Sequence, residues 1–234
     1  MRILALDTAT PCTVAAILND RQVVGEFAEA SRNHSVTLLP AIDKLLVDLG
    51  TDRNHIEAIA IGRGPGSFTG LRVGLAIAKT MAFSMKVPLV GVSSLQALAC
   101  NGESSGVDRI CPMLDALKNE IYCSEYILSE QKLTEVQAED ARDPGRWAES
   151  LARRSGRCML LGTGAQRYRK VLSEVLGDLA VFPGDESLHQ IRAGSVGGLG
   201  LTRLKAGETD DPYELEPSYC RLSEAELARQ AKKS

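Results

Sequence analysis

Residues 2–29 read RILALDTATPCTVAAILNDRQVVGEFAE and contain three short apolar or alternating runs separated by turn residues. These runs predict strands at 2–7, 12–18 and 22–29, with a tight turn at Asn19-Asp20. The following residues predict a helix at 35–49, a strand at 56–62, a helix at 69–86 and a short strand at 88–91. Strands joined by tight turns tend to be antiparallel and strands reached through helices parallel, so the first half predicts a mixed sheet.

The same order of elements restarts after a polar stretch at residues 101–106. The expected elements are strands at 109–114, 121–128 and 132–137, a helix at 144–155, a strand at 158–162, a helix at 165–176, a short strand at 180–182 and a helix at 187–206. Each half therefore repeats the unit strand-strand-strand-helix-strand-helix. The predicted fold is an α/β molecule of two lobes facing a cleft, of the actin-like, ribonuclease-H-like (ASKHA) type. Its lobes are expected at 1–103 and 104–221, with a polar tail at 222–234.

Composition and charge narrow the class of protein. The chain has 27 basic against 30 acidic residues, a net charge of −3, and its aromatic residues are 4 Phe, 5 Tyr and 1 Trp. This argues against a free-standing RNA-binding domain, which needs a basic surface and stacking rings. The first residues turn polar too soon for a secretory signal, and no stretch approaches the roughly 18 apolar residues of a membrane span. The 6 cysteines form no CxxC pair, so we expect a cytoplasmic protein with reduced cysteines.

Asp7 and Asp115 end the first strand of each half, directly before a turn. Two carboxylates that face one cleft would suit a metal–phosphate site. An aspartate in this position also caps a tight turn, which is the alternative interpretation. Phosphate-binding hairpins of this fold need glycine for close backbone approach, and Ala9 and Pro11 stand there instead, which argues against a working phosphate hairpin.

The densest motif is GRGPGSFTGLR at residues 62–72, where a strand runs into a helix. Glycines permit positive φ and close approach of the backbone, and a helix N-terminus favours anions. The motif is neither a P-loop nor a dinucleotide fingerprint, because no Gly-Lys-Ser/Thr follows and Ser67 stands where the third glycine would be. A strained turn capped by Ser67 or Thr69 fits equally well. The candidate nucleotide- or partner-contact residues are Asp7, Gly64, Gly66, Ser67, Thr69 and Arg72.

His34 opens a predicted helix, but Leu38 occupies the position one turn later where a second metal ligand would stand. No cysteine or carboxylate cluster replaces it, so no metal site is expected. Ser67 has no recognisable base in the sequence, and no residue is predicted to be catalytic.

The helix expected at 69–86 is apolar almost all round, whereas a helix in a two-layer domain needs one apolar face. Its small residues at i, i+4 and i+8 would let a second helix approach closely. The surplus apolar surface is covered either within the monomer or by a partner, and we favour the partner. The predicted interface residues on the helices at 35–49 and 69–86 are Leu38, Leu39, Ile42, Leu45, Gly74, Ala78, Met81 and Ala82.

Several motifs, in order along nearly the whole chain, resemble the TsaB family, formerly called YeaZ. They are RILALDTAT at 2–10, His34-Ser35 with Leu38-Leu39-Pro40, GRGPGSFTGLR at 62–72, GVSSL at 91–95, Asp115-Ala116 with NEIY at 119–122, and EPSY at 216–219. Leu117-Lys118 departs from the Arg-Met that the family often has, and Cys220 departs from a common leucine. Contacts made through that arginine are therefore not implied.

The resemblance implies a non-catalytic subunit of the machinery that makes threonylcarbamoyladenosine beside the anticodon of ANN-decoding tRNAs. It implies pairing, through the first-lobe helices, with the catalytic paralogue TsaD, which holds a metal through a His-x-x-x-His pair. The ATPase TsaE joins the pair, and TsaC makes the threonylcarbamoyl-AMP donor. The isolated subunit is expected to dimerise through the same helices, to meet tRNA through the complex, and to carry no cofactor of its own, with ATP and metal on its partners.

Two other functions stay open on the residues themselves. One is an autonomous ATP-binding enzyme of the sugar-kinase type, which would use Asp7, Asp115 and the glycine turn. The other is a glycoprotease-like hydrolase, which rests on analogy of architecture alone and lacks both a nucleophile–base pair and a metal pair.

Overall fold

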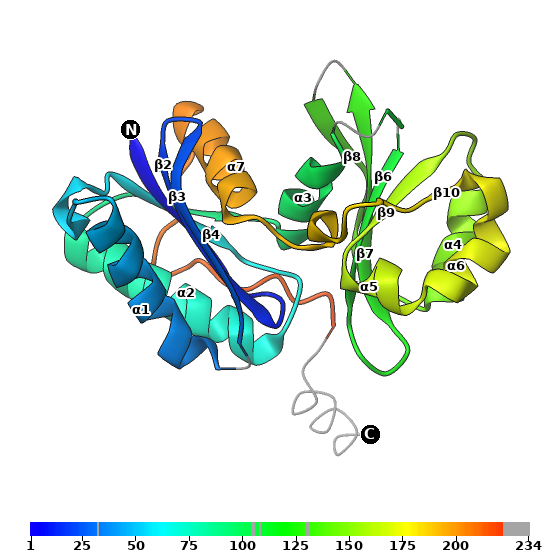
Figure 1. Cartoon of the computed structure of the whole chain (residues 1–234), viewed down its shortest axis with the longest axis horizontal. Coiled ribbons are helices and arrows are strands. Elements are labelled where there is room, and N and C mark those ends of the chain that lie inside the picture. The colour runs from blue at the N-terminus through cyan, green and yellow to red at the C-terminus, as the bar shows by residue number, and fades with distance from the viewer. Residues whose placement is uncertain (32, 104–105, 108, 130–131, 222–234) are drawn as a thin grey trace.

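The computed structural model describes residues 1–31, 33–103, 106–107, 109–129 and 132–221, and the expected tail at 222–234 lies outside them. Two five-stranded sheets form the two lobes (Figure 1). The first has the order β3-β2-β1-β4-β5, from β1 (Arg2–Asp7), β2 (Cys12–Asn19), β3 (Gln22–Ala30), β4 (Ala58–Gly62) and β5 (Leu89–Val92). The second has the order β10-β9-β6-β7-β8, from β6 (Arg109–Asp115), β7 (Ile121–Ser129), β8 (Lys132–Arg142), β9 (Cys158–Leu161) and β10 (Ala180–Val181).

The strand directions repeat between the sheets. The first three strands of each lobe are antiparallel neighbours, and the last two are parallel to the first. The two sheets therefore have equivalent orders, and the predicted duplicated, two-lobed actin-like fold is confirmed.

The helices follow the sequence pattern with three differences. They are α1 (His34–Asp48), α2 (Phe68–Met85), α3 (Ser94–Ala99), α4 (Pro144–Ala152), α5 (Thr163–Arg167), α6 (Arg169–Leu176) and α7 (Ala193–Lys205). The short α3 was not predicted, and the helix expected at 165–176 is divided at Tyr168, whose φ of −104° and ψ of 19° leave the helical region. The helix expected at 187–206 begins only at Ala193, after a 3₁₀ turn at Glu186–His189. None of the described helices is long and apolar enough to cross a membrane.

The last helix, α7, covers the first sheet although it follows the second lobe in the chain (Figure 1). Its glycines make this packing close, because a Cβ on Gly197 would lie 2.4 Å from Leu18 Cδ1 and one on Gly200 would lie 2.5 Å from Ala60 Cβ. Conversely, α3 precedes the second sheet in the chain but packs against its strands β6 and β7. The expected boundary after residue 103 therefore separates the two sheets but not the helices that cover them.

Residues 206–221, here called the C-terminal strap, return along α2 to the second lobe. The Asp210 N–H donates to the Leu89 carbonyl at 2.8 Å, and Lys79 Nζ donates to the Leu215 carbonyl at 3.0 Å. The buried side chain of Leu215 joins the core beneath α2. At the end of the strap, Arg221 pairs with Glu120 of the β6–β7 connection at 2.6 Å. The strap explains why α2 is apolar on more than one face.

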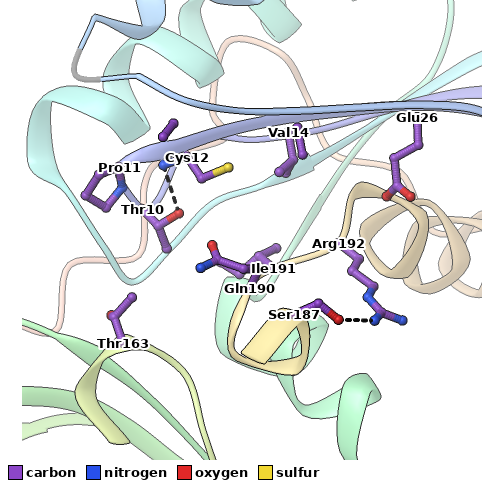
Figure 2. A pocket seen from close by; sticks show the side chains of 12 residues that line it. Thr10, Pro11, Cys12, Val14, Glu26, Thr163, Ser187, Gln190, Ile191 and Arg192 are labelled. Atoms are coloured by element: carbon purple, nitrogen blue, oxygen red, sulfur yellow. Dashed lines mark hydrogen bonds between the residues drawn. The ribbon is translucent and has the colours of Figure 1, made fainter. Parts of the chain in front are cut away.

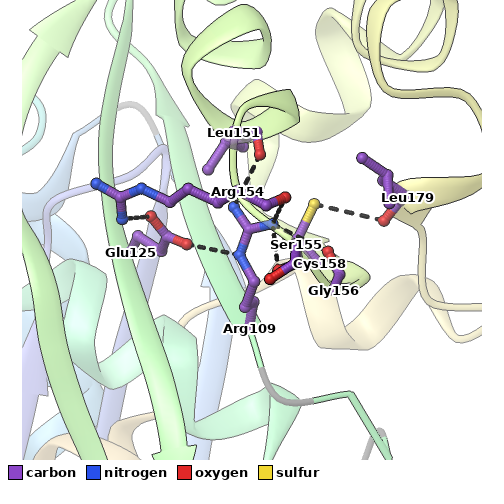
Figure 3. Close-up of polar contacts among 8 residues, drawn as sticks. All are labelled: Arg109, Glu125, Leu151, Arg154, Ser155, Gly156, Cys158 and Leu179. Carbon is purple, nitrogen blue, oxygen red and sulfur yellow. Dashed lines mark hydrogen bonds and ion pairs between the residues drawn. The ribbon is translucent and has the colours of Figure 1, made fainter.

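The second lobe contains a buried charge network behind α4 (Figure 3). Arg109 on β6 pairs with Glu125 on β7 at 2.7 Å, and both side chains are almost fully buried. Arg154 pairs with the other carboxylate oxygen of Glu125. The Arg109 guanidinium also donates to the carbonyls of Leu151 at 3.1 Å and Gly156 at 2.9 Å. Arg109 therefore supplies donors to the C-terminal end of α4, where helix carbonyls lack partners.

Candidate functional site

Asp7, the first predicted site residue, is 1% exposed at the end of β1. Its Oδ1 accepts the Ala9 N–H at 2.7 Å and its Oδ2 accepts the Ser94 hydroxyl at 2.6 Å. A Cβ on Gly62 would lie 1.8 Å from Asp7 Oδ2, so the backbone of β4 closes over the carboxylate. Burial raises the pKa of Asp7 to about 6, against the two hydrogen bonds, which lower it. Asp7 caps the turn and ties β1 to the start of α3, as the alternative interpretation of this residue predicted.

The glycine turn packs on the first hairpin of the same chain. A Cβ on Gly66 would lie 2.3 Å from the Ala9 carbonyl oxygen, and that oxygen accepts the Ser67 N–H at 2.7 Å. Ser67 Oγ accepts the Gly70 N–H at 3.2 Å and is the N-cap of α2. Thr8 Oγ1 donates to the Gly70 carbonyl at 2.8 Å. The glycines therefore allow the backbone of this turn to pack closely against the first hairpin.

The remaining loop residues differ in exposure. Gly64 is buried with a φ of +104°, a region that favours glycine. Thr69 and Arg72 lie exposed on the first turns of α2. The Arg72 guanidinium carbon lies 3.8 Å from the centroid of the Phe68 ring, and Arg72 Nε donates to the Tyr219 hydroxyl at 3.1 Å. Of the six predicted residues, Asp7 and Gly64 are therefore buried and Gly66 is partly buried, whereas Ser67, Thr69 and Arg72 are exposed.

Asp115 has a different environment from its first-lobe counterpart. It pairs with Arg167 at 2.8 Å and accepts the Leu117 N–H at 3.1 Å. After Ala116, the residues Leu117, Lys118 and Asn119 have φ values of 62°, 50° and 61°, a region that residues other than glycine rarely adopt. The two aspartates therefore have separate partners, and the departure from the family motif at residues 117–118 lies in a strained connection.

A cavity of about 650 Å³ lies between the lobes (Figure 2). The first-lobe side is lined by the first hairpin, β2 and β3 through Thr10, Pro11, Cys12, Val14, Glu26, Ala28 and Ala30. The other side is lined by Thr163, Ser187, Gln190, Ile191 and Arg192. Arg192, its one basic lining residue, donates to Ser187 Oγ at 3.2 Å. None of the six predicted loop residues lines this cavity.

His34 is a buried core residue. Its Nδ1 lies in hydrogen-bond contact with Thr13 Oγ1 at 2.7 Å, and burial lowers the pKa of the ring below its usual value. Across the part of the chain that the structure describes, no group of three His, Cys, Asp or Glu side chains is placed to hold a metal ion.

The predicted interface set needs correction. Six of its eight residues are buried inside the first lobe, namely Leu38, Ile42, Leu45, Gly74, Ala78 and Ala82. A Cβ on Gly74 would lie 2.2 Å from Thr8 Oγ1, so this small residue brings α2 close to the turn after β1 in its own lobe. Leu39 is exposed and Met81 is partly exposed, so both still lie on the surface.

Sequence reasoning missed most of the exposed apolar side chains on these helices. Val36, Leu39 and Val47 of α1 are 63%, 46% and 76% exposed, and Phe83 of α2 is 63% exposed. We call these four residues the α1–α2 face. The spacing of the α1 residues marks a second apolar stripe beside the one that packs on the sheet. Tyr213 of the strap extends the face, with its ring 5.8 Å from that of Phe83.

Comparisons with known proteins agree on one group. The family model of TsaD, tRNA N6-adenosine threonylcarbamoyltransferase, matches residues 27–229. The tRNA threonylcarbamoyladenosine biosynthesis protein TsaB of Bacillus subtilis (strain 168) is 33% identical over 228 residues, 97% of this chain and 96% of that protein. TsaB of Escherichia coli (strain K12) is 36% identical over 170 residues, 72% of this chain and 74% of that protein. The structure of YeaZ from Pseudomonas aeruginosa has a TM-score of 0.78 at 28% identity, covering 93% of this chain and 99% of that one.

Proposed function

Since this chain belongs to the TsaB family, we propose that it takes part in tRNA threonylcarbamoyladenosine biosynthesis as a subunit without catalytic activity of its own. In this proposal it activates a TsaD-like catalytic paralogue, which installs the threonylcarbamoyl group on N6 of the adenosine next to the anticodon of ANN-decoding tRNAs. A TsaE-like ATPase joins the pair. ATP and metal act on the partner subunits, and tRNA is bound by the complex.

The observation that carries the proposal is the α1–α2 face. Single exposed apolar residues are ordinary on a protein surface, but a group of them on two adjacent helices marks an interaction site. Three aliphatic side chains and one aromatic ring, each between 46% and 76% exposed, belong to two helices in contact with one another. A paralogue of the same architecture can offer an equivalent helical surface.

The environment of the first hairpin supports a non-catalytic role. Catalysis on a nucleotide phosphate needs backbone N–H groups and a carboxylate open to the cleft. Here the carboxylate of Asp7 is enclosed by Gly62 and Ser94, and the N–H of Ala9 donates to that carboxylate. At Thr8 and Ala9 the hairpin is fastened to the start of α2, and only its later residues Thr10, Pro11 and Cys12 line the cavity between the lobes.

The test is reconstitution of threonylcarbamoyl transfer with purified subunits. We expect no transfer by this chain alone, and transfer by the TsaD-like and TsaE-like proteins with the donor only when the chain is added. Leu39→Arg should abolish both co-elution with the TsaD-like protein and activation, because it places a charge in the apolar contact. Val136→Arg, at a valine 39% exposed on β8, is the matched control and should leave both intact. Transfer at a comparable rate without the chain would refute the proposal.

The isolated chain is proposed to form a homodimer through the same face. Size-exclusion chromatography over a dilution series should show a dimer that Leu39→Arg converts to a monomer. Adding the TsaD-like protein should replace the homodimer by a heterodimer, because both use one surface. A dimer unaffected by Leu39→Arg would assign self-association to another part of the molecule.

A further inference from the structure

Charge is distributed unevenly along the chain. Residues 142–170 contain 8 arginine and lysine residues and 2 acidic ones, a net charge of +6, so the remainder of the chain carries −9. The chain-wide value of −3 therefore conceals one strongly basic segment. This segment comprises α4, the connection from α4 to β9, β9, α5 and the start of α6.

The helices α4 and α6 of this segment lie on the flank of the second sheet away from the first lobe, whereas α5 lies beside the cavity between the lobes (Figure 1). Four of its cations are exposed and have no carboxylate partner within the described residues: Arg146, Arg153, Arg157 and Arg169. Arg169 lies over the Phe182 ring at 4.2 Å. We call these four arginines the basic face. Because these arginines form no ion pair within the described residues, they can bind an external anion without first breaking one.

The fold holds these side chains on rigid supports. The connection after α4 is fixed from below by Arg109, which donates to the carbonyls of Arg154 at 3.2 Å, Ser155 at 3.4 Å and Gly156 at 2.9 Å (Figure 3). Arg153 and Arg157 flank this anchored stretch. At the other end of α4, a Cβ on Gly145 would lie 3.7 Å from the Val171 side chain, so the helix begins against α6. Arg146 directly follows Gly145, and Arg169 stands two residues before Val171.

The chemistry of the basic face suits a phosphate backbone. Arginine presents a planar set of donors that matches phosphate in a two-pronged geometry. The aromatic side chains that are exposed among the described residues, Phe68, Phe83, Tyr213 and Tyr219, lie on α2 and the strap, so the basic face offers charge without stacking rings. Binding of this kind is independent of base sequence and strongly dependent on salt.

We propose that the basic face binds the sugar–phosphate backbone of the tRNA substrate while the α1–α2 face holds the catalytic partner. The proposal rests on the proposed function, because that function brings the chain into a complex that acts on tRNA. It gives this subunit a direct part in holding RNA. Glu149 is the carboxylate on the exposed side of α4, three residues after Arg146 and four before Arg153, and it weakens the face.

The test is a titration of fluorescently labelled tRNA with the complex and with the isolated chain. The triple variant Arg146→Gln, Arg153→Gln, Arg157→Gln should weaken binding about tenfold near physiological salt and lower the slope of log Kd against log salt by about two to three. The matched control Arg21→Gln, Arg53→Gln, Lys205→Gln removes the same charge from exposed first-lobe positions and should change the affinity less than about twofold. Glu149→Gln should strengthen binding, a gain that damage to the fold would not produce.

Equal affinity of the triple variant and its control would overturn the proposal. Loss of binding to anionic phosphatidylserine vesicles or to polyglutamate by the triple variant, with tRNA binding unchanged, would overturn it in favour of another polyanion. Co-elution with the TsaD-like protein is measured on the same samples and should be unaffected by the triple variant. Failure of the wild-type chain to pair with that protein counts against the proposed function alone, because the titration of the isolated chain still reports on the basic face.

Discussion

Replacing Asp7 by asparagine should change how the stability of the protein depends on pH. The folded chain holds the Asp7 proton up to about pH 6, because burial raises the pKa of this carboxyl from 3.8 to about 6. The unfolded chain releases the same proton near pH 3.8. The protonated carboxyl therefore contributes stability that is fully present below pH 3.8 and is lost as the pH rises through about 6.

The size of the effect follows from the two pKa values. The full shift corresponds to about 3 kcal/mol in the free energy of unfolding, and about 2 kcal/mol of it falls between pH 4.5 and 7.5. Asparagine stays neutral throughout, and its side chain can accept from the Ala9 N–H and donate to the Ser94 hydroxyl oxygen. Relative to Asp7→Asn, the wild type should lose about 2 kcal/mol over that interval.

The assay is urea unfolding of both proteins at several pH values, followed by circular dichroism. Only the difference between the two proteins is used, so titration of the other carboxyl groups cancels. Asp178→Asn, at an exposed position in the second lobe, is the control and should track the wild type at every pH. A difference between wild type and Asp7→Asn that stays constant with pH, or that favours the wild type as the pH rises, would refute the reasoning.

Three further predictions concern packing. Glu125→Gln should lower the free energy of unfolding by about 3 kcal/mol, measured by guanidinium unfolding, because it leaves the buried Arg109 guanidinium without an ionised partner. Gly74→Ala should lower the melting temperature although alanine favours helices, since its Cβ clashes with the first hairpin, whereas Gly198→Ala on α7, with open space around it, should raise stability by about 0.5–1 kcal/mol. Ala82→Arg should give insoluble or unfolded protein by circular dichroism and not a folded chain that fails to pair.

Much of the architecture was predictable from local patterns. The three opening strands of each half, the helices α1 and α2 and the repeated order all follow from the spacing of apolar residues. The short α3 was missed because six residues after a buried strand carry too little periodicity to distinguish a helix turn from a loop. The destination of α7 was missed because covering a distant sheet leaves no local signal beyond a run of glycines.

The candidate site was predictable in part. The motif at residues 62–72 was correctly predicted to lie at a strand-to-helix turn. Ser67 was one of the two residues predicted to cap the helix, and it is the N-cap of α2. The interface residues were misassigned because the sequence shows that Gly74, Ala78 and Ala82 share a stripe but not which neighbour the stripe meets. The strap and the closeness of Thr8, both distant along the chain, supply that information. The basic face was not predicted because the net charge was summed over the whole chain, which averages the basic segment with the acidic remainder.

The position of α7 also decides the order in which the molecule can be completed during synthesis. Strands β1, β2 and β4 leave the ribosome first, yet the helix that covers one face of them is made last, after the whole second lobe. The second sheet, whose strands and outer helices are contiguous between residues 109 and 181, can assemble while the first still exposes an apolar face. A nascent chain halted before residue 193 should therefore need a chaperone, and a gene fragment encoding residues 1–103 should not yield a stable lobe.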